Sequence, residues 1–238
     1  MGLLNALIES AGRFKDDLLP IGYEERDVTW IVNIDSTGKQ PAEVKKQVPR
    51  KKIQAPATPS DRTSGKVSPT LLVDKISYAL NIANAEKKGD AQRIAGTEYK
   101  AFTDLLLLAL EKTKNAAVGQ LTNWFNHEDQ VSAVRKQIQG KPSDLVMFEV
   151  GSQSQIIDNP SIQQFWAEYM ADRLAEEKQA CVNCGKIKKV PRILPFKIKL
   201  PTCSVQIAAF NSDAFCSAGG TTKSANNGAL CYTCAGIA

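Results

Sequence analysis

The sequence predicts an α+β fold. We expect an N-terminal mixed α/β domain with a small antiparallel sheet, a helical middle, and a cysteine-rich, zinc-ribbon-like C-terminal part. Three observations predict these parts. Apolar residues alternate through 28–34, as in a strand with one buried face. Helical spacing of apolar residues dominates 70–180. Two CxxC pairs follow, and the resulting domains are 1–180 and 181–238.

Length and composition narrow the class of protein. The chain has 238 residues, of which 43% are hydrophobic and 23% charged, so it can bury an ordinary globular core. No uninterrupted apolar run approaches the ~20 residues that a membrane-spanning helix needs. The N-terminal segment lacks the basic start of a signal peptide. We therefore expect a cytoplasmic protein without a membrane partner, in which cysteines are more often free or metal-bound than paired.

The first 69 residues predict a helix, a hairpin and a long loop. Apolar residues in 3–14 have the spacing of an amphipathic helix. The strand at 28–34 runs into Asp35-Ser36-Thr37-Gly38, a turn signal that makes a hairpin plausible. Residues 39–69 contain five prolines and no apolar periodicity, which predicts a basic loop.

The cations and hydroxyl of this loop are candidate nucleic-acid ligands, because flexible basic side chains can neutralise phosphates without reading sequence. The candidate residues are Lys45, Lys46, Arg50, Lys51, Lys52, Arg62, Ser64 and Lys66. The C-terminal segment adds to the same electrostatic pattern. Residues 181–238 carry seven positive charges against Asp213 alone, whereas the whole chain has a net charge of +5. One-sided basic segments are typical of proteins that bind a polyanion.

The middle of the chain predicts helices with one strand among them. Asn159 can cap a helix that Pro160 begins, and Ile162, Trp166 and Met170 follow at helical spacing. We interpret this stripe as core packing. The apolar run at 145–150 predicts a strand.

The two cysteine pairs predict a structural metal site. Cys181 and Cys184 form one CxxC, Cys231 and Cys234 form the other, and two intervening residues let both sulfurs of a pair converge on one ion. Four thiolates favour Zn²⁺ as a structural cofactor. A redox-active CxxC is a weaker alternative, because no βαβ pattern surrounds either pair. Unrelated buried cysteines are the other alternative.

The sequence gives little support for catalysis. His127 is the only histidine, and it stands beside two acidic residues as exposed histidines often do. The chain has no nucleophile elbow, no phosphate-binding P-loop and no HExxH zinc motif. We therefore expect a protein that is not an enzyme.

Several segments, taken in order, resemble one family. The order is similar to that in the large subunit of the type I-C CRISPR effector complex, called Cascade. The segments are Leu3-Leu4-Asn5-Ala6-Leu7-Ile8-Glu9, Gly22-Tyr23, Trp30-Ile31-Val32-Asn33-Ile34-Asp35, Arg62-Thr63-Ser64-Gly65, Pro69-Thr70-Leu71-Leu72-Val73-Asp74, Tyr78-Ala79-Leu80, Phe165-Trp166, Cys181-Val182-Asn183-Cys184-Gly185 and Phe210-Asn211-Ser212-Asp213-Ala214-Phe215.

The resemblance implies a non-catalytic DNA-binding subunit that recognises the PAM, the short duplex motif beside the target, and helps to open the duplex in antiviral defence. Its implied partners are a guide RNA, the other Cascade subunits, target double-stranded DNA and a recruited helicase-nuclease. It places residues 62–66 near the PAM duplex. Family members are usually longer and end in a helical bundle, so this chain would correspond to their N-terminal portion. The alternatives are a free-standing zinc-stabilised adaptor that binds RNA or protein, and a cysteine-dependent redox protein.

Overall fold

The structure is a computed structural model that describes residues 3–11, 13, 18–37, 40–59, 62, 66–83, 90–151, 156–191, 197–199, 202, 204–206 and 229–237. Contacts divide the chain into two compact units. One unit is Tyr23–Trp166, and the other combines Met1–Gly22 with Ala167–Ala238. The domain boundary predicted at residue 180 falls inside the second unit, because β5 (Ala175–Ala180) pairs there with β6 (Ile187–Pro191).

The Tyr23–Trp166 unit contains a four-stranded sheet in the order β2-β1-β4-β3. Its strands are β1 (Tyr23–Ile34), β2 (Glu43–Pro56), β3 (Val73–Lys75) and β4 (Leu145–Val150). The predicted hairpin is confirmed, since β1 and β2 pair antiparallel. The β1–β4 pair is parallel, so the sheet is mixed rather than wholly antiparallel. The predicted α+β class is confirmed.

The prediction of a basic loop over 39–69 is wrong for residues 43–56, which form strand β2. β2 lies at the edge of the sheet, and most side chains in its first ten residues are exposed. A strand with two solvated faces needs no alternation of apolar residues, so the usual signal is absent. Edge strands and bulges also accept proline, which explains why Pro49 is tolerated here.

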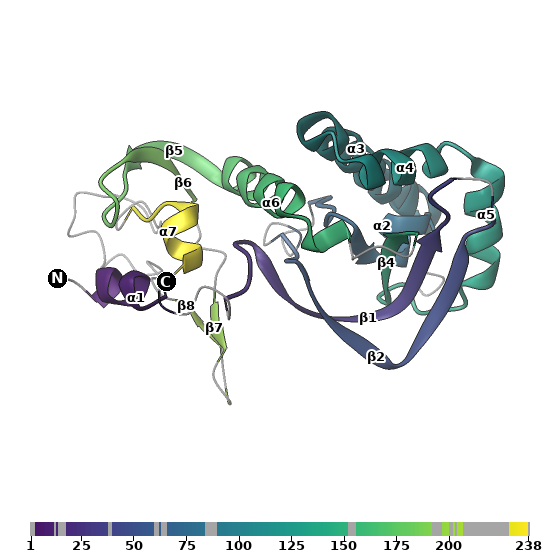
Figure 1. Ribbon diagram of the computed structural model, residues 1–238, viewed down its shortest axis with the longest axis horizontal. Coiled ribbons are helices and arrows are strands. Elements are labelled where there is room, and N and C mark those ends of the chain that lie inside the picture. Colours follow the sequence, from purple (N-terminus) through teal and green to yellow (C-terminus); the bar gives the residue numbers. More distant parts are fainter. Residues whose placement is uncertain are drawn as a thin grey trace. The chain divides into compact units, whose positions relative to one another are not determined.

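Helices cover the end of the β1–β2 ribbon that also carries β4 (Figure 1). Apolar side chains of these helices pack with the strands to form the core, in which Phe102 and Trp124 lie near Phe148 of β4. The ring centroids of these two pairs are 6.0 and 6.1 Å apart. The helices are α2 (Ile76–Leu80), α3 (Ala91–Thr113), α4 (Ala116–Phe125) and α5 (Glu128–Gln137).

The helix predicted after Asn159 is confirmed as α6 (Pro160–Arg173), which follows the short helix η3 (Ile156–Asp158). The Asn159 side chain accepts a hydrogen bond from the Ser161 backbone N–H at 3.0 Å. Ile162, Trp166 and Met170 are all buried, as core packing requires.

The second unit contains short elements from both flanks of the first. They are α1 (Leu3–Ala11), the β5–β6 hairpin, the β7–β8 hairpin (Lys197–Lys199 with Ser204–Gln206) and α7 (Tyr232–Ile237). Helices α1 and α7 contact each other. Among the described residues, no helix combines the length and apolar character that a bilayer crossing demands.

Candidate metal centre and nucleic-acid interface

The structure brings together the four cysteines that the sequence selected. The sulfur atoms of Cys181, Cys184, Cys231 and Cys234 all lie within 4.8 Å of one another. Cys181 directly follows β5 and Cys184 lies in the turn before β6. Cys231 directly precedes α7, and Cys234 lies in the first turn of that helix. All four are free thiols, and three of them are buried. Residues 50 positions apart in the chain therefore converge on one point.

Backbone geometry explains the convergence. Gly185 has φ of +66°, and its N–H donates to the Cys181 carbonyl at 2.8 Å, which closes the turn between the first two thiols. The Val182 N–H donates to the Ala229 carbonyl at 2.8 Å and thus ties the hairpin to the segment before α7. The Cys231 N–H points at the Cys181 sulfur at 3.4 Å.

The surroundings of three of the thiols shift their pKa values in different directions. Burial opposes ionisation of Cys181, but hydrogen bonds from backbone N–H groups, first that of Cys184, outweigh it and lower the Cys181 pKa to about 6. Burial raises the pKa of Cys231. Burial, together with the hydrogen bond that the Cys234 thiol donates to the Cys231 sulfur, raises the pKa of Cys234 to about 12. Cys181 therefore favours the thiolate form at neutral pH, whereas Cys231 and Cys234 favour the protonated form until a bound cation displaces their protons.

The donor set fits a metal ion. An ion bound by four thiolates at ~2.3 Å requires sulfurs about 3.8 Å apart, so the observed spacing needs only a small contraction. The Asn183 side-chain amide donates to the Cys234 sulfur at 3.5 Å, which is the kind of outer contact that orients a thiolate ligand. Four protein ligands leave no open position for a substrate. Cys203 and Cys216 lie outside the described residues.

The fold places most of the predicted nucleic-acid ligands on strand β2, whereas Arg62 lies apart from them in a buried ion pair with Asp74. Strand β2 carries Lys45, Lys46, Arg50, Lys51 and Lys52, and all but the half-buried Lys51 are exposed. The strand therefore presents a row of cations to solvent along one edge of the sheet. We call this row the basic edge.

Acidic partners neutralise only part of the basic edge. Lys45 lies 3.0 Å from Glu43, and Arg50 lies 3.0 Å from Asp144. Lys46 instead lies above the Trp30 ring, 5.5 Å from its centroid. The Lys45–Glu43 pair is exposed on both sides and contributes little to stability, so Lys45 can exchange partners at small cost, whereas the Asp144 partner of Arg50 is buried.

Arg62 is held inside the protein. Its guanidinium donates to both carboxylate oxygens of Asp74, at 2.8 and 2.7 Å, and its Nε donates to the Ser68 carbonyl at 2.7 Å. It also stacks on Tyr78, 4.1 Å from the ring centroid. The Arg62 side chain is only 10% exposed. Arg62, a predicted DNA ligand, thus binds a carboxylate of its own chain in a bidentate geometry. Of the other two predicted ligands in this segment, Lys66 is exposed and Ser64 lies outside the described residues.

Sequence reasoning missed the residues that face the basic edge from another part of the chain. Lys141 and Asp144 lie about 90 positions beyond β2, yet they line the same cavity as Lys46 and Arg50. Only the turn-forming composition of Gly140-Lys141-Pro142-Ser143 could have marked this segment. Nothing in the sequence pattern links it to β2.

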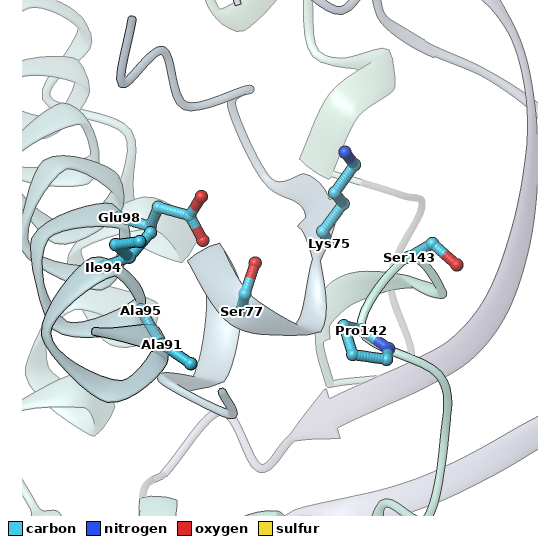
Figure 2. A pocket seen from close by; sticks show the side chains of 8 residues that line it. All are labelled: Lys75, Ser77, Ala91, Ile94, Ala95, Glu98, Pro142 and Ser143. Carbon is cyan, nitrogen blue, oxygen red and sulfur yellow. The ribbon is translucent and has the colours of Figure 1, made fainter. Parts of the chain in front are cut away.

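A second cavity, of about 200 Å³, lies between α2, α3 and the turn before β4. Figure 2 shows the Glu98 carboxylate and the Ser77 hydroxyl on its helical side and Lys75, Pro142 and Ser143 on the opposite side. Its charged groups are of opposite sign. The cavity therefore does not share the positive character of the basic edge, and the described lining contains neither histidine nor cysteine.

The chain contains a four-cysteine cluster and an α+β unit, and comparison with known proteins identifies its family. Residues 4–237 match the family model described as CRISPR-associated protein (Cas_Csd1). The match covers nearly the whole chain, so the protein belongs to the Cas_Csd1 family of CRISPR-associated proteins. A search of curated proteins finds no match.

Proposed function

We propose that the chain is a non-catalytic DNA-binding subunit of a CRISPR RNA-guided surveillance complex, the large subunit of type I-C Cascade. It would recognise the PAM duplex and help to open target DNA in antiviral defence. The single observation that carries this proposal is the basic edge, five cations on an exposed strand of a CRISPR-associated protein. Such a strand can follow a phosphate backbone without reading sequence.

The proposed partners divide the work. In guided effectors the guide RNA reads the target sequence by base pairing, while the protein reads the short motif beside it and holds the backbone. The other Cascade subunits and a helicase-nuclease complete the cytoplasmic complex. Because the net charge is only +5, the isolated chain should bind DNA weakly and with steep salt dependence. Tight binding would need the assembled complex.

The proposed cofactor is one structural Zn²⁺ on the four cysteines. Zinc prefers thiolate ligands in tetrahedral sites, and a fully protein-ligated ion acts by holding the fold together. Here it would tie the β5–β6 turn to α7, two segments about 50 residues apart in the chain. The buried apolar residues around the thiols are Leu230 and Ala235. A centre this small gains much of its stability from the metal.

Charge reversal on the basic edge tests the DNA-binding role. The complex, purified with its guide RNA and partner subunits, should bind target duplex less tightly when Lys51 and Lys52 are both changed to glutamate. Each lost phosphate contact should also reduce the slope of log affinity against log salt by about 0.9. The matched control is Lys112→Glu with Lys136→Glu, which makes the same change in net charge on helices α3 and α5.

Lysines also protect edge strands from pairing with other chains, so the experiment must separate protection from binding. If both charge-reversal pairs bind DNA like the parent, and the β2 pair only promotes aggregation, the basic edge has the protective role alone. If the chain purifies without guide RNA and partner subunits, the Cascade assignment fails. Capture of RNA or of a protein by the free chain would then favour the zinc-stabilised adaptor.

A further inference from the structure

The pairing of β1 and β2 contains a large irregularity opposite Thr29. Val28 pairs with Lys51, but Trp30 pairs with Lys46, so the four residues 47–50 of β2 lie opposite a single residue of β1. Bulges of this kind re-aim side chains and often occur beside functional sites. Residues 47–50 therefore leave the regular β1–β2 pairing in the middle of the basic edge. We call these four residues the arch.

A cavity of about 420 Å³ lies under this arch. This volume is within the usual range for small-molecule sites and can accept one nucleotide. The lining includes Thr29, Lys46, Val48, Arg50, Lys141 and Asp144. Three of these residues are cationic and one is acidic, which leaves the lining positive.

The lining has a polar group without a partner and an exposed apolar group. Thr29 is 5% exposed, and its buried hydroxyl has no hydrogen-bond partner among the residues that the structure describes. Leaving a buried hydroxyl unpaired is unfavourable, so a ligand that bonds to it is favoured. On the arch, Val48 is 81% exposed, the highest value among the exposed large apolar side chains of the described residues, and it lies between Lys46 and Arg50 in the strand. Apolar side chains in basic surroundings can pack on the face of an unstacked base.

We propose that this cavity binds one unstacked nucleotide of a DNA strand. Lys46, Arg50 and Lys141 would hold the flanking phosphates, Val48 would cover one face of the base, and the Thr29 hydroxyl would bond to its edge. This proposal rests on the proposed DNA-binding function and deepens it. It assigns to the arch a contact with a base, whereas the rest of the basic edge contacts the backbone.

The contribution of the base to the binding affinity can be isolated by comparing two short single strands. They are an oligothymidine and its abasic counterpart, which have equal numbers of phosphates. At low ionic strength, fluorescence anisotropy with the full chain should show binding of the oligothymidine about fivefold to tenfold tighter, the range expected for one hydrogen bond with apolar contact. Thr29→Val and Val48→Ser should each reduce this ratio toward one. Lys52→Ala is the matched control, because it should weaken both strands equally and preserve the ratio.

Thermal unfolding separates a binding role of Thr29 from a structural one. Valine has nearly the same shape and removes the unpaired hydroxyl, so Thr29→Val should unfold at the same or a higher temperature than the parent. Equal affinity of the parent for both strands would overturn the nucleotide cavity and leave backbone binding intact. An unchanged ratio in both Thr29→Val and Val48→Ser would also overturn it. If neither the chain nor the complex with guide RNA and partner subunits binds either strand or a duplex, the proposed function is overturned as well.

Discussion

Replacing Arg62 with alanine should destabilise the Tyr23–Trp166 unit, although the sequence marks this residue as a DNA ligand. The substitution removes two hydrogen bonds to Asp74 and leaves that carboxylate without its hydrogen-bonded cation. The Asp74 side chain is fully buried. Breaking a buried pair in this way costs about 3–5 kcal/mol, because the remaining charge is desolvated. The buried Arg26 guanidinium still attracts the Asp74 carboxylate, which offsets part of this cost.

The contacts that Asp74 keeps in the Arg62→Ala variant determine how much unfolding free energy is lost. Asp74 keeps backbone donors from Thr70 at 2.6 Å and from Lys75 at 2.7 Å, which partly solvate the carboxylate. We therefore expect a loss of about 3 kcal/mol, at the lower end for buried pairs. Arg62→Lys keeps the charge but not the bidentate geometry, so its loss should be smaller. The comparison between the two variants measures what geometry contributes beyond charge.

Denaturant unfolding followed by tryptophan fluorescence is the suitable assay, since all three tryptophans lie in this unit. The matched control is Arg93→Ala. Arg93 pairs with Asp90 at 2.7 Å, but both side chains are more than 60% exposed, so the loss should be at most about 1 kcal/mol. The reasoning is refuted if Arg62→Ala unfolds like Arg93→Ala and instead weakens DNA binding. Arg62 would then be the DNA contact that the sequence predicts.

Three further predictions concern the metal and a helix. The purified chain should contain one zinc per molecule by elemental analysis, and full zinc content after Cys184→Ser with Cys231→Ser would rule out the site. Because Cys231 and Cys234 have raised pKa values, loading must displace their protons, so zinc affinity measured by chelator competition should fall as the pH falls; a pH-independent affinity would contradict thiolate ligation. Asn115→Ala should destabilise α4 by about 1 kcal/mol in denaturant unfolding, because the Asn115 side chain accepts hydrogen bonds from two backbone N–H groups of its first turn; an unchanged midpoint would show that the cap is dispensable.

Elements with a local chemical signal could be predicted from the sequence. The CxxC spacing identified the four thiols, since two residues between cysteines suffice to form half of a site. The Asn159-Pro160 cap and the apolar stripe identified α6, because helical contacts are local in sequence. The strand at 145–150 was likewise marked by its continuous apolar run.

Features that depend on distant pairing could not be predicted. β2 has no apolar alternation, and only its hydrogen bonds to β1 make it a strand. The ion pair of Arg62 with Asp74 gives the arginine a structural role that its position in a basic, proline-rich segment conceals. The approach of Asp144 to Arg50 depends on the whole path of the chain through α2 to α5. Each of these interactions is set by tertiary structure, which a single sequence does not encode locally.

The discontinuous make-up of the unit that holds the thiols has a consequence for synthesis on the ribosome. Ile8 of α1 packs against the cluster of Cys181, Leu230 and their neighbours, which leave the ribosome more than 170 residues later. At typical translation rates this delay is about 10–40 s, during which the intervening unit can already fold. A helix of nine residues is marginal by itself, so α1 must wait for its partner in an unfolded or chaperone-bound form. We therefore expect the Tyr23–Trp166 unit to fold first and the four-cysteine cluster to form last.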